Sequence, residues 1–115
     1  MTLQFEDVRK AIHSMLNEVV EQGFQHSQNF PDDSDLAHKL IQKSDTELKN
    51  LINLARKDNL TLNPDVKQQA FNQTITQAEK TSLNLLSQLQ LMRRRSVLLK
   101  KSSDKSQPIS SLSPF

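Results

Sequence analysis

The sequence predicts an all-α protein, and three observations support this. The 115 residues include only one Gly and four Pro, too few for the many turns of an all-β fold. Apolar residues recur at helical spacing in three segments, which two prolines separate. Apolar residues make up only 35% of the chain, which is little for a self-sufficient core. We therefore expect an antiparallel helical hairpin that completes a four-helix bundle with a partner chain, followed by a C-terminal helix and a flexible tail.

The first predicted helix covers about residues 4–28. Its apolar positions are spaced 3, 4, 3 and 4 residues apart, the spacing of a bundle seam: Phe5, Val8, Ile12, Met15 and Val19. Leu16 and Val20 widen this stripe. The helix must end by Phe30, because the residue before a proline avoids the helical region.

The second predicted helix covers about residues 34–57. Asp32, Asp33, Ser34 and Asp35 suit a helix start, where side-chain oxygens accept hydrogen bonds from free N–H groups. A Ca²⁺ loop would need alternating ligands and a Gly turn, so we prefer the helix start. Its apolar stripe consists of Ala37, Leu40, Ile41, Leu48, Leu51, Ile52 and Ala55. Ser44 interrupts this stripe, and a small residue there would allow close helix approach.

The third predicted helix begins with Asn63 as its cap and Pro64 in the first position, and it ends near residue 99. Its apolar positions are Val66, Ala70, Phe71, Ile75, Ala78, Leu83, Leu85, Leu86, Leu89, Leu91 and Met92. The second half is apolar nearly all round, so other helices must surround it. The expected organisation is therefore a hairpin with the heterodimer face (1–58), a linker and docking helix (59–101), and a Ser/Pro-rich tail (102–115).

Several chemistries have no residues to support them. The chain has no Cys, and Gly23 is its single Gly, so thiolate metal sites, Cys nucleophiles and phosphate-cradling loops are excluded. The histidines His13, His26 and His38 lack the spacing of a metal-binding pair. We expect no enzyme activity, cofactor or metal. Early acidic residues argue against a signal peptide, and no apolar run is long enough to cross a membrane.

Residues 91–101, "LMRRRSVLLKK", carry the strongest local charge. Residues 59–115 hold three acidic and eight basic residues, and the basic cluster comprises Arg93, Arg94, Arg95, Lys100 and Lys101. It could complement the helix dipole and flank a buried stripe, meet an acidic partner or act as a nuclear-import patch, or bind nucleic acid, although no aromatics interleave with it. Arg93 to Ser96 also resembles a basophilic kinase site, where a phosphate would cancel local charge.

Two stretches carry a resemblance to a known family. Residues 7–24 resemble the first helix of fungal Mediator subunit 11, through Ser14, Met15, Leu16, Glu18 and a later Phe24. Residues 41–54 are similar to the second helix of that family, through Lys43, Ser44, Thr46 and Leu48, followed by Ile52 and Leu54. The pattern continues more weakly to residue 89. The tail after Arg95 has no counterpart in the family.

The resemblance implies a nuclear, non-enzymatic subunit of the Mediator head module. Its hairpin would pair with the hairpin of subunit 22, and its last helix would dock against head subunits including subunit 17. The assembly would support RNA polymerase II pre-initiation complexes and reach general transcription factors, without membrane binding or sequence-specific DNA reading. The resemblance implies heterodimer contacts through Val8, Ile12, Met15, Leu16, Val19, Ile41, Leu48 and Leu51. The remaining stripe residues that we expect to bind partners are Phe5, Ile52, Leu85, Leu86, Leu89 and Met92.

Two other classes of protein remain open. A kinetochore or cytoskeletal tethering subunit would need a longer seam, which Pro31 and Pro64 interrupt. A small basic homodimer that binds nucleic acid would use the basic cluster, and its binding would weaken steeply with added salt.

Overall fold

The structure is a computed structural model that describes residues 3–106, with the side chains of residues 58 and 99–106 excepted. It contains three long helices, α1 (Phe5–Asn29), α2 (Ser34–Asp58) and α3 (Pro64–Ser106), and a short 3₁₀ turn, η1 (Pro31–Asp33). The described part of the chain has no strand. The all-α prediction is therefore confirmed.

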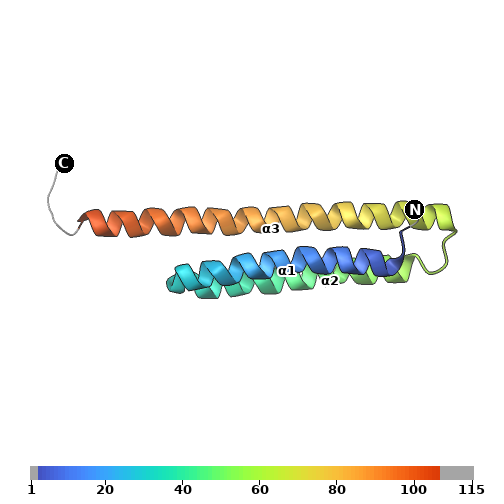
Figure 1. The fold of residues 1–115 in the computed structure, drawn as a ribbon, viewed down its shortest axis with the longest axis horizontal. Coiled ribbons are helices and arrows are strands. Elements are labelled where there is room, and N and C mark those ends of the chain that lie inside the picture. The colour runs from blue at the N-terminus through green and yellow to red at the C-terminus, as the bar shows by residue number, and fades with distance from the viewer. Residues whose placement is uncertain (1–2, 107–115) are drawn as a thin grey trace.

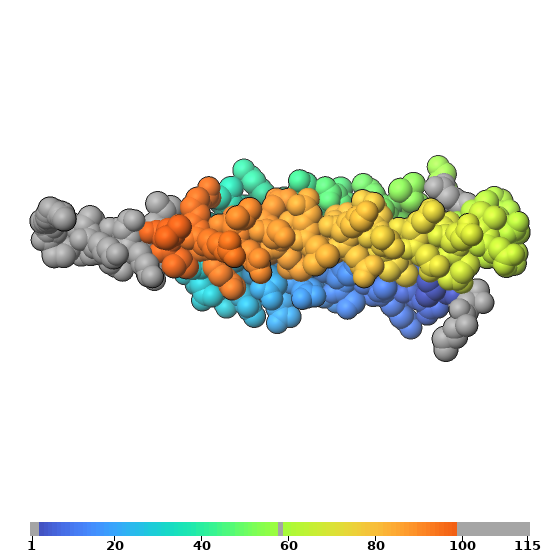
Figure 2. Space-filling view, turned by 90° about the horizontal axis from the view of Figure 1, so that it is seen from above, coloured from blue at the N-terminus to red at the C-terminus, as the bar shows by residue number. Residues whose placement is uncertain are grey.

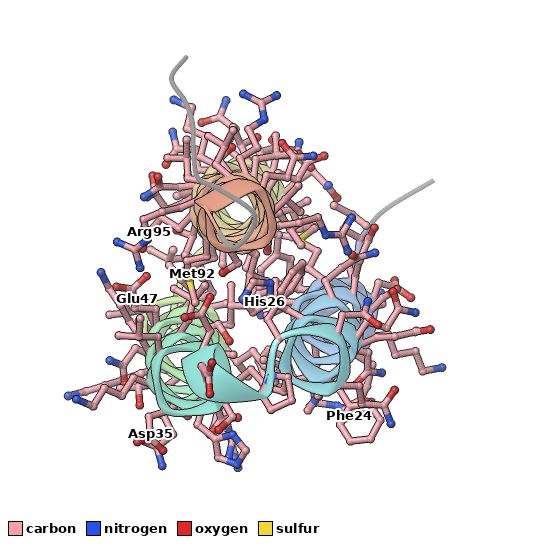
Figure 3. The ribbon with its side chains drawn as sticks, turned by 90° about the vertical axis from the view of Figure 1, so that its left-hand side faces the viewer. Phe24, His26, Asp35, Glu47, Met92 and Arg95 are labelled. Carbon is pink, nitrogen blue, oxygen red and sulfur yellow. The ribbon has the colours of Figure 1, made fainter. Side chains whose placement is uncertain are left out.

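The helices run up, down and up, and α3 lies along the groove between α1 and α2 (Figure 1, Figure 3). Because α1 and α3 are parallel, the chain start lies near the start of α3, where Leu3 N–H donates to Gln68 Oε1 at 2.7 Å. The molecule measures 71 × 21 × 19 Å. Its length comes from α3, which continues past the α1–α2 turn (Figure 1).

Local hydrogen bonds and prolines set the helix starts. Gln4 N–H donates to Asp7 Oδ2 at 2.9 Å before the first turn of α1. Val66 N–H donates to Asn63 Oδ1 at 3.0 Å, so the predicted cap of α3 is confirmed. Pro64 follows this cap in the first helical position, where its missing N–H has no helical partner to lose.

Two apolar clusters form the core, and each takes side chains from all three helices. The first lies toward the start of α1 and contains Val8, Ile12, Leu16, Leu48, Ala55, Phe71 and Ala78. The second lies toward the α1–α2 turn and contains Val19, Leu40, Leu85 and Leu89, with Leu86 and Met92 packed against it. In this structure α3 therefore covers the hairpin face that we expected a partner chain to cover.

Small residues let α1 and α2 approach each other closely. Gly23 is buried, and a Cβ added there would lie 2.7 Å from Cδ1 of Ile41. Ser44 is fully buried as well, and its hydroxyl donates to the Ile41 carbonyl at 2.7 Å, so its burial leaves no unpaired polar group. The interruption of the stripe at Ser44 is thus a packing feature of the hairpin.

Helix α3 is longer than the sequence predicted. It is one continuous helix to Ser106, whereas we expected an end near residue 99 and a tail from residue 102. The Ser, Asp and Lys residues of this stretch tolerate a helix, and no proline occurs between Pro64 and Pro108 to stop it. The rest of the predicted tail, residues 107–115, lies outside the described residues.

The core location predicts the effect of truncating Leu48, which is 0% exposed. Leu48→Ala should lower the unfolding free energy by about 2–5 kcal/mol, because it leaves a cavity between three helices. Leu54→Ala is the matched control on α2, since Leu54 is half exposed, and it should change stability by less than about 0.5 kcal/mol. Urea denaturation followed by circular dichroism measures both values. Equal effects at the two sites would contradict the single-chain core.

Candidate interaction surface

The residues that we assigned to partner binding all face the interior of this single chain. Half of them are buried: Val8, Ile12, Leu16, Val19, Leu48, Leu85 and Leu89. The other half are partly buried: Phe5, Met15, Ile41, Leu51, Ile52, Leu86 and Met92. The structure does bring these residues together, and they pack against one another within the same chain. Another chain could reach the buried ones only if α3 moved away from the hairpin.

The outer face of α3 carries exposed leucines, which the sequence pattern alone did not identify as a surface. Leu83, Leu91 and Leu98 are 65%, 62% and 64% exposed. They are eight and seven residues apart, so they fall within about 80° of one another on a helix of 3.6 residues per turn. The buried residues Leu85 and Leu89 fall on the opposite side of α3 at this helical spacing, and α3 lies over α1 and α2 (Figure 2). The signal in the sequence was the nearly all-round apolar pattern of residues 83–92, which one groove cannot cover.

The basic cluster lies on α3 near the α1–α2 turn. Arg93, Arg94 and Arg95 are exposed, whereas the side chains of Lys100 and Lys101 lie outside the described part of the chain. The suggestion that the arginines complement the helix dipole is wrong, because α3 continues for about three more turns beyond Arg95 and the dipole effect is confined to the last turn. Arg93 instead lines a depression beside Leu86 and Leu89 of the second apolar cluster.

A polar cluster, which we call the turn clasp, joins α3 to the α1–α2 turn through His26, Asp33 and Ser96. The Ser96 hydroxyl donates to Asp33 Oδ2, and His26 Nε2 lies 3.2 Å from the same oxygen. His26 is 1% exposed, points into the space between the three helices (Figure 3), and its ring centroid lies 5.0 Å from that of Phe30. Its members are 7 and 63 residues apart, so sequence spacing gave no signal of this cluster.

Asp33 lies at the predicted start of α2, and its side chain belongs to the turn clasp. It occupies the position before α2, but its side chain makes no capping bond to that helix. The hydroxyl of Ser96 lowers the pKa of the Asp33 carboxyl below its ordinary value of 3.8, and His26 and the charge of Arg95 add to this against the opposing effect of burial. The predicted helix start is therefore confirmed, but the Asp33 carboxylate contacts His26 of α1 and Ser96 of α3 instead of capping α2.

The residue types Ser, His and Asp invite comparison with a nucleophilic triad, but the geometry differs. In a triad the histidine stands between the carboxylate and the hydroxyl and takes the hydroxyl proton. Here the Ser96 hydroxyl and the His26 imidazole both contact the same oxygen of Asp33. The lowered pKa of Asp33 also makes this carboxylate a weaker base. The arrangement holds three elements together and does not activate Ser96.

Two shallow depressions accompany the bundle. One lies between α1 and α3 beside His26 and is lined partly by Leu86, Leu89 and Arg93. The other lies at the opposite end and is lined partly by Phe5 and Phe71. Within the described residues, no group of three or more His, Asp or Glu side chains is placed to hold a metal ion. No helix in this part of the chain is long and apolar enough to cross a membrane.

Comparisons with known proteins do not identify a relative. No protein-family model matches the chain, no curated protein matches it, and no solved structure matches it.

The lowered pKa of Asp33 predicts an acid-dependent contribution to stability. Because this pKa is lower in the folded than in the unfolded chain, the stabilisation is complete above about pH 5 and is lost as pH falls through the folded value. The difference in unfolding free energy between wild type and Asp33→Asn should therefore shrink as pH falls below about 5, and it should level off only below the folded pKa, where Asp33 is neutral in both states. Urea titrations across the acid range measure this difference.

Asp35→Asn provides the control for this titration, because Asp35 is exposed in the first turn of α2. It lies near the turn but takes no part in the turn clasp. A wild-type advantage over Asp33→Asn that stays constant from neutral to strongly acidic pH would contradict the assignment of Asp33.

Proposed function

We propose that this chain is a non-enzymatic, nuclear subunit of the Mediator head module that works by binding other helical subunits. The observation that carries the proposal is the exposed leucine face of α3, formed by Leu83, Leu91 and Leu98. An amphipathic helix that keeps an exposed apolar stripe suits recognition by another helix. The resemblance to fungal Mediator subunit 11 supplies the identity of the complex, and its two stretches fall on α1 and α2.

The outer face of α3 is a better partner surface for the folded chain than the hairpin face. Leu83 and Leu91 are already in water, so a partner can cover them without unfolding anything. Covering a large apolar side chain is worth about 1.5–3 kcal/mol. Reaching Val8 or Ile12 would first require the loss of the contacts that α3 makes with both apolar clusters.

The four-helix bundle that the resemblance implies can then arise in two ways. In the arrangement we favour, a helix of subunit 22 packs on the outer face of α3, and this chain contributes three helices. In the other, α3 leaves the hairpin and a partner hairpin takes its place. The polar first half of α3, which includes the run from Lys67 to Gln69, makes the second arrangement less costly than it would be for a fully apolar helix.

The exposed arginines restrict the character of the partner. Arg94 and Arg95 are exposed and fall within or beside the leucine face at 3.6 residues per turn. An acidic partner helix would therefore be attracted to this end of α3 and held in one orientation. The contacts to subunit 17 and, indirectly, to RNA polymerase II and general transcription factors follow from the resemblance alone.

Co-expression of the full chain with candidate subunit 22 tests the function. We expect a one-to-one helical complex by light scattering and circular dichroism, more stable than either chain alone. If the chain does not bind subunit 22 and forms a stable homodimer, the Mediator proposal is overturned. Binding to DNA that weakens steeply with salt would favour the basic homodimer instead.

A surface variant tests the partner face directly. Leu91→Asp should weaken partner binding at least about tenfold, because it places a charge in the apolar contact, and it should leave the thermal midpoint of the free chain nearly unchanged. Leu54→Asp is the matched control, since Leu54 is half exposed on α2 and away from α3's outer face. Isothermal titration calorimetry measures both affinities.

The same pair of variants separates the two arrangements. If subunit 22 replaces α3 on the hairpin, Leu91→Asp binds like wild type and the amides around Leu85 and Leu89 exchange faster in the complex. That result would refute the outer-face arrangement. Leu48→Asp would not discriminate between them, because Leu48 belongs to the core of the free chain.

A further inference from the structure

The turn clasp forms the polar connection between the distal part of α3 and the rest of the bundle. Two hydrogen bonds found in the described residues join α3 to other elements, one from Leu3 to Gln68 near its start and one from Ser96 to Asp33 near the turn. Around Ser96, the apolar contacts of α3 come from Leu89 and Met92. The docking of this end therefore depends on one small apolar cluster and one hydroxyl group.

Ser96 stands directly after three exposed arginines, Arg93, Arg94 and Arg95. Protein kinases that select basic sequences recognise arginines two and three residues before the acceptor hydroxyl. Ser96 is itself partly exposed, so it sits at the edge of the interface and not within the core. The arginines that a kinase would recognise are thus exposed to solvent, whereas the Ser96 hydroxyl is hydrogen-bonded to Asp33.

We propose that Ser96 is a phosphorylation site for an Arg-directed protein kinase and that its modification releases the distal part of α3 from the α1–α2 turn. In this reaction the Ser96 oxygen forms a bond to the γ-phosphorus of ATP and the bond between that phosphorus and ADP breaks. The hydroxyl proton passes to the kinase's catalytic base. The proposal concerns regulation and does not depend on the identity of the complex.

The release follows from the hydrogen-bond chemistry of the clasp. The unmodified hydroxyl donates to the Asp33 carboxylate, but a phosphorylated serine has lost that donor. It presents acceptor oxygens and a charge of about −1.5 to −2. Two anionic acceptors then face each other beside the nearly buried His26, where repulsion is poorly screened.

A better partner for the phosphate lies on α3 itself. Arg93 is three residues before Ser96, and residues at this spacing are neighbours on a helix surface. Its exposed guanidinium can form charge-assisted hydrogen bonds to the phosphate. These bonds compete with any contact between the modified side chain and Asp33.

The geometry also limits when a kinase can act. Kinases bind their acceptor segments in an accessible form, and Ser96 is both helical and bonded to Asp33. The distal part of α3 must therefore undock before the reaction. Asp33→Ala removes the acceptor of the Ser96 hydroxyl, so the kinase should phosphorylate Ser96 faster in this variant. The same substitution should not change the phosphorylation rate of a solvent-exposed serine elsewhere in the chain.

The experiment treats the full chain with the catalytic subunit of cyclic-AMP-dependent protein kinase and magnesium ATP. Fragmentation mass spectrometry locates the phosphate, which is needed because Ser102 and Ser103 also follow basic residues. Ser96→Ala is the control for modification elsewhere. We expect phosphate on Ser96 in the wild type, and a rate about tenfold higher in Asp33→Ala, as for the loss of a hydrogen bond to a charged group.

Hydrogen–deuterium exchange then measures the release. Amides of residues 89–98 and of the turn, residues 26–33, should exchange about tenfold to hundredfold faster after phosphorylation. The first apolar cluster, around Ile12 and Leu48, should keep its wild-type rates. The effect of the phosphate should exceed that of Ser96→Ala, because alanine removes only the donor whereas phosphate adds repulsion.

Two results would overturn the proposal. One is a Ser96 that stays unmodified in both the wild type and Asp33→Ala. The other is a modified Ser96 whose flanking amides exchange at the unmodified rate. Neither result affects the proposed function, because the experiment contains no partner subunit and leaves Leu91 unchanged.

Discussion

The packing of α3 into the groove of the α1–α2 hairpin is the contact on which the rest of this structure depends. Both apolar clusters include α3 side chains, such as Phe71 in the first and Leu85 in the second. Without α3, the hairpin would expose a stripe from Val8 to Val19, and each large side chain in it would forfeit about 1.5–3 kcal/mol of burial. Helix α3 thus supplies, within the chain, the cover that the composition suggested a partner would have to supply.

Helix periodicity and caps were predictable from the sequence because they are local. The seam spacing of α1, the break before Pro31 and the Asn63 cap depend on neighbours within a few residues. The cover of the hairpin could not be predicted in the same way. The choice between α3 and a partner chain depends on whether the scattered apolar residues of α3 meet the groove in register, and spacing alone cannot decide that.

The candidate sites show the same distinction between local patterns and tertiary contacts. The stripe residues were predicted to contact a partner chain, and in this structure they pack against helices of the same chain. The turn clasp was out of reach because His26, Asp33 and Ser96 come from three separate elements. The local pattern at Asp33 favoured a helix cap, and a tertiary contact prevailed over it. A local propensity of this kind is worth about 1 kcal/mol, which hydrogen bonds from two other elements can exceed.

Helix α3 carries both the inner face that packs on the hairpin and the outer face proposed to bind a partner. Assembly with a partner is therefore coupled to folding. The inner face of α3 holds the hairpin through Leu85 and Leu89, while the outer face presents Leu83 and Leu91 to water. A partner that binds only the outer face adds its free energy to that of folding, because the folded form is the one that presents the stripe. A partner that needs the hairpin must instead compete with α3, and its affinity is reduced by the small fraction of chains in which α3 has left. Control of α3 docking at the turn would therefore decide which kind of partner the chain can accept.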